Sequence, residues 1–269
     1  MRILAITVWP LAGLILQVSM MAKQERAGQA QTRKPTDSEE LYDRVYKGDQ
    51  TAIPSLEQVY SRGNPEGDLT GDILSIGHTF EANIASLLVS RGVKDPKYFQ
   101  FIFELARQAI ETDIPSPVAF GKDGHFVPHF TPPDFVAWCN LRKIEPRQAA
   151  LDAWYHLPGR VIPLAASGDP RGFSLLAKGL KSPNYMVVKM SAEGLARIND
   201  ARAIPLIIEA CKKSPVEVTS DIATYLVYFD NAAAQAAVDR LITTDKEKEL
   251  LTALRNDFRK RGLQAIFGY

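Results

Sequence analysis

One short phrase of sequence returns at a fixed distance along this chain, and the repetition limits the folds that are open to it. "GDPRGFSLL" begins at Gly168, and "NDARAIPLI" begins 31 residues later, at Asn199. At the same offset, apolar positions farther along also coincide, among them Leu195 with Leu226. Internal repeats of roughly 20 to 50 residues are typical of solenoids, in which each unit buries its apolar face against the next unit. We therefore expect stacked repeat units.

Each unit is expected to be a pair of helices. Between residues 202 and 212, apolar residues recur at i, i+3, i+4 and i+7, which is one stripe of an α-helix. Asp200 is the expected N-cap of this helix, and Pro205 lies in its first turn, where a missing N–H costs little. Ser214 and Pro215 end it, and a second helix is expected over 216–228. The residues expected on the inner sides of the helices are Leu195, Ile204, Ile207, Val218, Ile222, Tyr225, Leu226 and Phe229.

The repeated phrases resemble a known family. They are "GDPRGFSLLAKGL", "MVVKMSAEGLARIND" and "ARAIPLIIEACKKSPVEV", with "GDQTAIPSL" from Gly48 as an earlier partial copy. They resemble the HEAT-like repeat family, in particular its short phycobilisome-lyase type, over Gly168 to about Ile242. The resemblance implies an all-α fold, an α-solenoid of stacked antiparallel helix pairs of the HEAT/armadillo kind, but little about activity. Gly179 and Gly194 depart from the pattern, since glycine inside a helix costs about 1 kcal/mol relative to alanine.

Four charged residues recur in phase within these repeats. Asp169 and Arg171 in one unit correspond to Asp200 and Arg202 in the next. We interpret them as a ladder of helix caps and ion pairs between neighbouring units. This interpretation favours a structural role for the four residues over an active site.

The repeat domain is expected to cover residues 41–269, with clean repeats at 168–242. The Ala-Ile-Pro triplets at 52–54 and 203–205 lie 151 residues apart, close to five periods, but five clean units are not expected between them because the register fails at 113–133. Residues 245–261 are amphipathic and predict a capping helix, since a terminal repeat needs a polar outer face. Its expected inward residues are Leu250, Leu251, Leu254 and Phe258.

The N-terminus is expected to lie outside the repeat domain. One basic residue, Arg2, precedes an apolar run from Ile3 to Leu16, about the length of a signal-peptide core and short for a membrane span. Residues 1–22 therefore predict an export signal, with cleavage after Ala22 or near Ala30, and the alternative is an uncleaved anchor formed by residues 3–21. Residues 23–40 are polar without apolar periodicity and predict a flexible linker. The expected location is periplasmic or extracellular, with a membrane association only if the segment stays uncleaved.

The segment 113–133 is the most individual part of the chain. It contains five prolines and two glycines, and 118–120 and 125–127 flank "GKDG", which predicts a small hairpin or irregular insertion. Lys122 and Asp123 are expected in solvent at the tip, with the phenylalanines facing inward. The insert either packs its aromatic residues on the solenoid to fill a gap, or serves as a lid for a ligand or partner, or is disordered.

If binding has one preferred place, we expect it near His125, Phe126, His129 and Phe130. A long aromatic insertion adds ordering cost without contributing to stacking, and exposed aromatic residues are good anchors for a partner. The spacing of His125 and His129 also suggests a metal site, but Pro128 between them disfavours a helix and no third ligand is evident. No metal and no other cofactor is expected.

Other features argue against several functional classes. The net charge of +1 does not suggest nucleic acid as a partner. Cys139 and Cys211 fall in apolar helical stripes and predict buried, unreactive thiols, with a disulfide or a nucleophile as alternatives. The sequence lacks GxSxG, CxxC, GxGxxG and HExxH motifs. The first hypothesis is an exported, non-enzymatic scaffold that binds another protein. The alternatives are a lyase-type enzyme or accessory, and a sensor whose insert holds a small apolar ligand.

Overall fold

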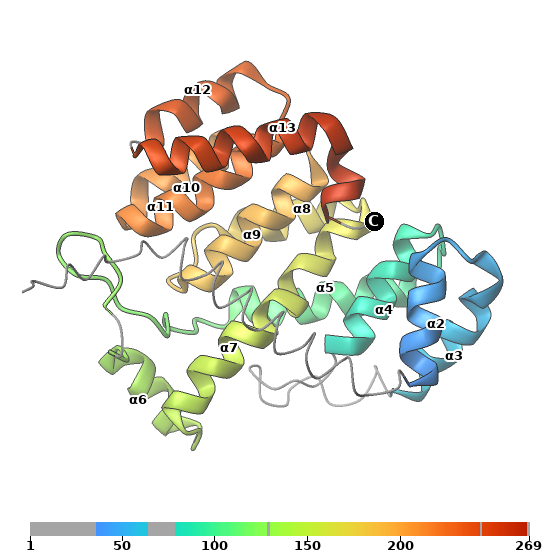
Figure 1. Ribbon diagram of the computed structural model, residues 1–269. Coiled ribbons are helices and arrows are strands. Elements are labelled where there is room, and N and C mark those ends of the chain that lie inside the picture. The colour runs from blue at the N-terminus through green and yellow to red at the C-terminus, as the bar shows by residue number, and fades with distance from the viewer. Residues whose placement is uncertain (1–35, 64–78, 128–129, 243, 268–269) are drawn as a thin grey trace, which may run out of the picture.

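The computed structural model describes residues 36–63, 79–127, 130–242 and 244–267, and this part of the chain is mostly helical (Figure 1). Its one β contact is an antiparallel bridge between Phe120 and Phe126, so the predicted all-α class is confirmed. Three short 3₁₀ helices are η1 (Gln50–Ala52), η2 (Ile162–Ser167) and η3 (Thr224–Tyr228). The α-helices are α2 (Asp37–Tyr46), α3 (Ile53–Arg62), α4 (Thr79–Ser90), α5 (Pro96–Glu111), α6 (Pro133–Leu141), α7 (Pro146–Val161), α8 (Pro170–Gly179), α9 (Tyr185–Ile198), α10 (Ala203–Lys213), α11 (Val216–Ala223), α12 (Ala232–Leu241) and α13 (Asp245–Phe267).

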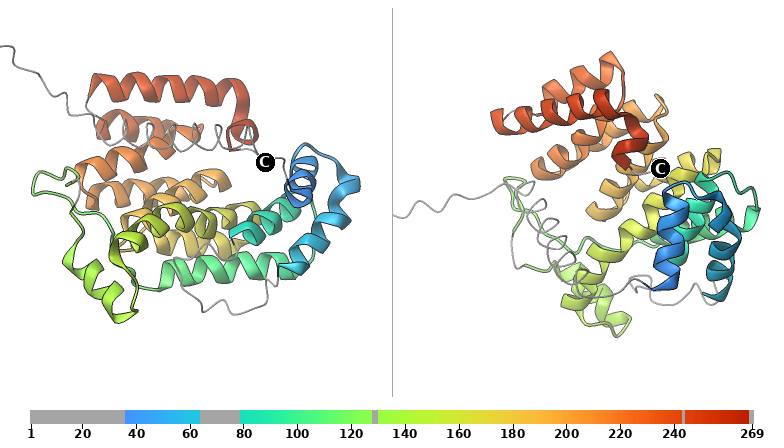
Figure 2. Two further views of the ribbon diagram at one scale, coloured as in Figure 1. Left: turned by 60° about the horizontal axis from the view of Figure 1, so that its bottom comes forward. Right: turned by 45° about the vertical axis from the view of Figure 1, so that its right-hand side comes forward.

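The helices pack as successive pairs. The first and second helices of these pairs are α3 and α4, α5 and α7, α8 and α9, and α10 and α11, and α12 and α13 continue the series (Figures 1 and 2). Each second helix also contacts the next one, in the order α4, α7, α9 and α11, and α13 packs on η3. Among the first helices, α5 contacts α8 and α10 contacts α12. Every pair therefore buries an apolar stripe that it would expose alone.

The two Ala-Ile-Pro triplets lie at the starts of α3 and α10, which are three pairs apart rather than five. The spacing in sequence is longer than three periods because the connection between α3 and α4 and the insert between α5 and α7 are long. As expected, five clean units do not lie between the triplets. The failure of register at 113–133 is an insertion between the two helices of one pair.

The core forms at the positions that the repeat register predicts. Leu195, Ile207 and Leu226 are fully buried, and Ile204 is 4% exposed. Val218, Ile222 and Phe229 are buried as well. These residues belong to one continuous apolar cluster that extends from α2 to α13. The packing of consecutive pairs through this cluster holds the solenoid together.

The two glycines that depart from the family pattern have a packing role between α8 and α9. A Cβ atom at Gly179 would lie 2.1 Å from Oγ of Ser191, and one at Gly194 would lie 2.9 Å from a methyl carbon of Leu176. Each glycine thus lets a side chain of the partner helix approach its backbone closely. Glycine at these two positions lowers the helix propensity of α8 and α9, and the close approach of the two helices requires it.

The folded domain begins slightly earlier than expected. Helix α2 starts at Asp37, so residues 37–40 belong to a helix and not to the predicted linker. A reciprocal capping box explains the start, because Thr36 and Glu39 bind each other's backbone N–H groups. The predicted signal or anchor at 1–22 and linker residues 23–35 lie outside the described residues. Within the described ranges, no helix combines the length and the apolar character that a membrane crossing needs.

The predicted capping helix corresponds to α13. Leu251 is buried, and Leu254 and Phe258 pack against the core cluster. Leu250 is 37% exposed, so the expectation that it faces inward is wrong. It lies one residue away from the stripe formed by the other three. The helical backbone is interrupted at Gly262, which has a φ of 74°, one residue beyond the predicted end of the cap.

Candidate functional site

The insert between α5 and α7 contains the hairpin that the sequence predicts, although it is reduced to a single bridge between Phe120 and Phe126. Beside the bridge, the N–H of Gly121 donates to the carbonyl of His125 at 2.7 Å. The turn between them includes Gly124 with a φ of 79°, a conformation that favours glycine. The hairpin reaches the end of the molecule where α9 and α11 begin (Figures 1 and 2).

The hairpin is bound to the start of α11 through Glu217. One carboxylate oxygen of Glu217 accepts the N–H of Phe126 at 2.5 Å, and the other lies 3.2 Å from Nδ1 of His125. The N–H of Glu217 donates in return to the carbonyl of Gly124 at 3.5 Å. The side chain of Glu217 is 14% exposed, so these contacts lie in partly dehydrated surroundings.

A second group of contacts joins the insert to the start of α9. The ring of Phe120 packs edge-on against the ring of Tyr185, with their centroids 5.9 Å apart. Asn184 is fully buried and caps α9 by accepting the N–H of Met186 at 2.9 Å, while its Nδ2 atom donates to the carbonyl of Pro115 at 3.3 Å. The insert thus spans the starts of two consecutive second helices. Packing of the aromatic residues on the solenoid was one of its expected roles.

The four residues expected to mark a binding place have different surroundings. The side chain of His125 is 59% exposed, Phe126 is half-buried, and His129 lies outside the described residues. Phe130 is 51% exposed, so the expectation that all phenylalanines of the insert face inward is wrong. After it the chain enters α6, and Phe135 is the residue that becomes buried there.

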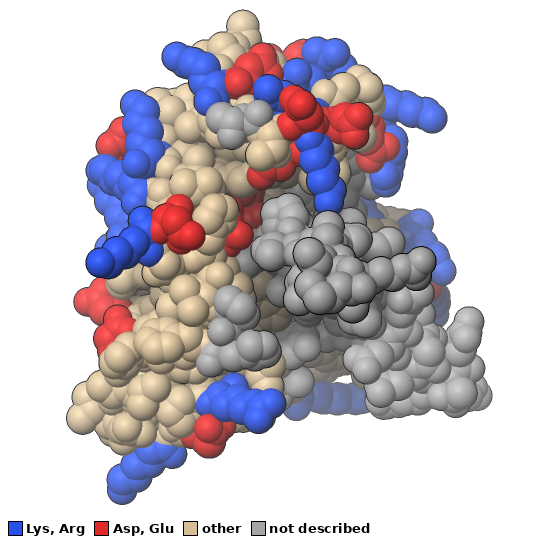
Figure 3. All heavy atoms as spheres, turned by 60° about the vertical axis from the view of Figure 1, so that its left-hand side comes forward, with Lys and Arg blue, Asp and Glu red and all other residues tan. Residues whose placement is uncertain are grey.

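Exposed apolar side chains gather around the insert. Of the eight large ones in the described residues, five lie on the insert, on α6 or on the parts of α7 and α11 beside it. In the view of Figure 3, an area without charged side chains lies at the lower left, and basic and acidic side chains border it below. A concentration of this kind marks an interaction surface more often than scattered single residues do. The five residues are Val127 (36% exposed), Phe130 (51%), Leu141 (83%), Leu151 (46%) and Val216 (60%).

A polar network that the sequence analysis missed joins α9 to α11 and to the 3₁₀ helix η3 that follows it. The hydroxyl of Tyr185 donates to Asp221 at 2.9 Å, and Nζ of Lys189 lies 3.2 Å from the same carboxylate. In the reverse direction, the hydroxyl of Tyr225 donates to Glu193 at 3.0 Å. Burial raises the pKa of both tyrosines, and the negative charges of Asp221 and Glu193 raise it further.

The contacts within this network account for the raised pKa values of Tyr185 and Tyr225, so those values do not by themselves indicate a catalytic role. Each tyrosine hydroxyl has a carboxylate acceptor on the neighbouring helix, and Arg197 pairs with Glu193 as Lys189 pairs with Asp221. The sequence signal was a spacing of four residues along α9, which places Tyr185, Lys189, Glu193 and Arg197 on one face of that helix.

The recurring acidic and basic residues form ion pairs within each unit. Arg171 pairs with Asp169 at 2.9 Å, and Arg202 pairs with Asp200. Asp169 caps α8 as expected. Asp200 accepts the N–H of Arg202 before α10 begins at Ala203, and it is therefore not the N-cap of that helix.

The link between neighbouring units comes from stacking of the same arginines. The guanidinium carbon of Arg171 lies 4.7 Å from the ring centroid of Phe99 on α5, and that of Arg202 lies 4.7 Å from the ring centroid of Phe173 on α8. The acidic residue of each pair orients the guanidinium over a ring of the preceding unit. The expected ladder thus consists of ion pairs inside units and cation–π contacts between them.

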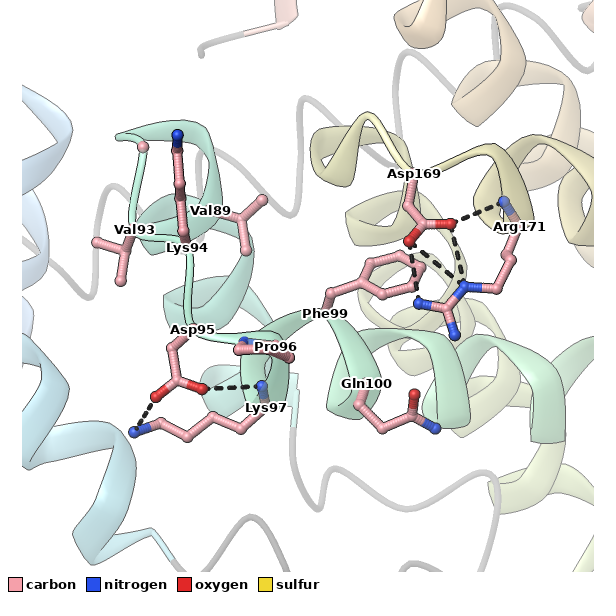
Figure 4. A pocket seen from close by; sticks show the side chains of 11 residues that line it. Val89, Val93, Lys94, Asp95, Pro96, Lys97, Phe99, Gln100, Asp169 and Arg171 are labelled. Atoms are coloured by element: carbon pink, nitrogen blue, oxygen red, sulfur yellow. Dashed lines mark hydrogen bonds and ion pairs between the residues drawn. The ribbon is translucent and has the colours of Figure 1, made fainter.

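A depression of about 670 Å³ adjoins this ladder between the starts of α5 and α8 (Figure 4). Its charged lining consists of Lys94, Asp95, Lys97, Asp169 and Arg171. Hydrogen bonds from Lys97 and Arg171 hold the pKa values of Asp95 and Asp169 below their usual range. Both carboxylates are occupied as caps and ion-pair partners, so the depression is built from groups that already have a structural role.

Two kinds of potentially reactive side chain remain, the cysteines and the candidate metal ligands. Cys139 and Cys211 are buried, and burial raises the pKa of the Cys211 thiol to about 12. No group of three or more His, Cys, Asp or Glu side chains in the described ranges is placed to hold a metal ion.

The fold and its repeated contacts define a class of protein, an all-α repeat protein of stacked helix pairs. Residues 188–213 match the family model of the PBS lyase HEAT-like repeat. The match covers most of α9 and all of α10, which are the second helix of one pair and the first helix of the next. This part of the chain is thus similar to a HEAT-like repeat, and the stacked helix pairs around it agree with that family's architecture. The comparisons with curated proteins and with solved structures gave no match.

Proposed function

We propose that this protein is a non-enzymatic scaffold that binds another protein through the surface around the insert. The observation that carries the proposal is the position of Val127, Phe130, Leu141, Leu151 and Val216, which are the majority of the exposed large apolar side chains in the described residues. Burial of such side chains at an interface is favourable by about 25 cal/mol per Å² of apolar surface removed from water.

A protein partner fits this surface better than a small ligand does. The exposed apolar residues are spread over the insert, α6 and the adjoining helices, whereas a small-molecule site gathers such residues in a cavity. A depression of about 430 Å³ at the base of the insert is lined mainly by prolines and small or polar residues, among them Pro115, Ser116, Ala119 and Pro183. The lyase named in the family description is not part of the proposal, because such repeats serve many functions.

The test replaces three exposed residues in the full chain. The variant Val127→Ser, Phe130→Ser, Leu141→Ser is compared with Leu250→Ser, whose side chain is 37% exposed on α13 and is not one of the five residues of the proposed surface. Circular dichroism and urea unfolding establish that both variants fold as the wild type does. Each protein is then immobilised and exposed to native extract, and captured proteins are quantified by mass spectrometry.

We expect at least one protein to be captured by the wild type and by Leu250→Ser and to be lost with the triple variant. Purified, that partner should bind the wild type directly. Retention of every captured protein by the triple variant would show that the surface around the insert is not the binding surface. The partner would then have to bind elsewhere along the second helices.

The proposal also includes export, which rests on the sequence of residues 1–22. Expressed in a host with a secretory pathway, the chain should lose its first 20 to 30 residues, roughly as a signal peptide of this kind does. Mass spectrometry of the protein from the periplasm or medium checks the mass. An intact Met1 on a soluble cytoplasmic product would contradict export, and an intact Met1 in the membrane fraction would favour the anchor formed by residues 3–21.

A further inference from the structure

We infer that Glu217 is the positioning residue of the hairpin, and that the hairpin in return caps the start of α11. The two segments hold each other through reciprocal backbone and side-chain contacts, although they are distant in sequence. The relevance of this junction to binding rests on the proposed function, because Val127 and Phe130 of the binding surface follow the hairpin directly. The junction itself is defined by contacts that do not depend on any partner.

The start of α11 lacks a side-chain cap of its own. Its N-cap position is occupied by Pro215, which provides no side-chain acceptor. The first N–H groups of a helix have no partner within the helix and need acceptors from elsewhere. The carbonyl of Gly124 accepts the N–H of Glu217, so the turn of the hairpin supplies one of them.

The carboxylate of Glu217 makes the contacts from α11 back to the hairpin. It binds the N–H of Phe126 at 2.5 Å and lies 3.2 Å from Nδ1 of His125. In a capping box, a glutamate at the third helical position binds the backbone N–H of the N-cap residue, but Glu217 is the second helical residue and the N-cap Pro215 has no N–H. Here the same kind of contact is made with the inserted hairpin. Hydrogen bonds to an ionised carboxylate are stronger than those between neutral groups, which makes Glu217 the main attachment.

The contact also requires glycine at the tip of the hairpin. A Cβ atom at Gly124 would lie 2.9 Å from the backbone nitrogen of Val216 and 3.2 Å from its side chain. The positive φ of 79° at Gly124 disfavours any other residue independently of this approach. The turn is therefore adapted to the start of α11 in conformation and in shape.

Hydrogen exchange measured by mass spectrometry on the full chain tests the inference without a partner. Glu217→Ala removes the carboxylate, and Glu217→Gln keeps an oxygen acceptor for the N–H of Phe126. The matched control is Glu209→Ala, which removes an exposed glutamate that pairs with Lys212 and Lys213 on α10. Gly124→Ala disturbs the same contact from the side of the hairpin. Peptides that cover residues 118–127 report on the hairpin, and peptides from α8 and α12 report on the rest of the solenoid.

Glu217→Ala should accelerate exchange in 118–127 by about tenfold or more, since a hydrogen bond to a charged group is lost. Exchange in α8 and α12 should remain as in the wild type. Glu217→Gln should recover part of the protection, Gly124→Ala should reproduce the acceleration, and Glu209→Ala should leave exchange in 118–127 unchanged.

Two results would overturn the inference. One is unchanged exchange in 118–127 of Glu217→Ala, which would mean that other contacts position the hairpin. The other is a uniform rise through all helices in Glu217→Ala and Gly124→Ala, which would make both residues general contributors to stability. Neither result depends on the capture experiment, whose triple variant leaves Glu217 and Gly124 intact.

Discussion

Replacement of Gly179 by alanine should destabilise the protein, although helix propensity alone predicts the opposite. Alanine is favoured over glycine inside a helix by up to about 1 kcal/mol. At Gly179, however, the added Cβ would lie 2.1 Å from Oγ of Ser191, 3.1 Å from its Cβ and 3.3 Å from Cδ1 of Ile110. Overpacking a filled core costs about 1–3 kcal/mol. We expect Gly179→Ala to lower the free energy of unfolding by about 1–2 kcal/mol, the part of the overpacking cost that propensity does not offset.

Ser191→Ala is the second mutation of a double-mutant cycle with Gly179→Ala. Ser191 is fully buried, and its hydroxyl has no hydrogen-bond partner in the described structure. A buried unsatisfied polar group costs about 1–3 kcal/mol, so Ser191→Ala should be neutral or stabilising. It also removes the atom that would contact the new methyl group most closely. In the Ser191→Ala background, Gly179→Ala should therefore cost at least about 1 kcal/mol less than in the wild type, which a double-mutant cycle measures.

Urea unfolding followed by circular dichroism gives the four free energies of the cycle. Gly194→Ala, whose Cβ would meet buried Leu176 at 2.9 Å, should also destabilise but should show no coupling to Ser191→Ala. A gain of stability of about 1 kcal/mol in Gly179→Ala would mean that propensity decides the result. A coupling energy between the two changes below about 0.3 kcal/mol would refute the close contact itself.

Three further outcomes follow from burial. Leu226→Ala should cost about 2–5 kcal/mol in urea unfolding, because Leu226 is fully buried between pairs; a change below about 0.5 kcal/mol would contradict the repeat register. Tyr185 and Tyr225 have folded pKa values raised first by burial, so their contribution to stability is complete below about pH 10 and declines as the pH rises above that value toward the folded pKa values. Ultraviolet difference spectra should show these two tyrosines ionising only on unfolding, and ionisation near pH 10 in the folded protein would disagree. Cys139 and Cys211 should react with a thiol reagent only after denaturant is added, and rapid labelling of the native protein would contradict their burial.

The repeat register could be predicted because it is local. Leu195, Ile207 and Leu226 recur with helical spacing inside units of 31 residues, and their burial follows from that pattern alone. The pairing of α5 with α7 could not be predicted in the same way. The insert separates these helices in sequence, and helix periodicity does not indicate which distant helix will be the neighbour. The sequence therefore gives no indication that α5 and α7 form one pair.

Some features of the candidate site could likewise be predicted from the sequence, and others could not. The composition of 113–133 and the turn sequence "GKDG" were enough to indicate the hairpin, while a binding place near His125, Phe126, His129 and Phe130 stays a prediction. Glu217 could not be found, because it looks like an ordinary acidic residue in the first turn of a helix, and its partner Phe126 is 91 residues away. Phe130 was expected to face inward because it is aromatic, but its burial depends on where α6 begins. Contacts between distant segments decide both cases.

The position of the insert allows it to restrict bending between several helix pairs. An α-solenoid bends and twists because each unit contacts only its neighbours, and small changes between units add up. The insert leaves the array after α5 and contacts the start of α9 through Asn184 and Tyr185, and the start of α11 through Glu217. A segment of the second pair is therefore attached to the third and fourth pairs. Bending between those pairs would have to break the bonds to Asn184 or Glu217, so this part of the solenoid should be stiffer than α12 and α13. The exposed residues around the insert would then lie on a part of the array that is stiffer than α12 and α13, and the proposed binding surface would lose little conformational entropy on meeting a partner.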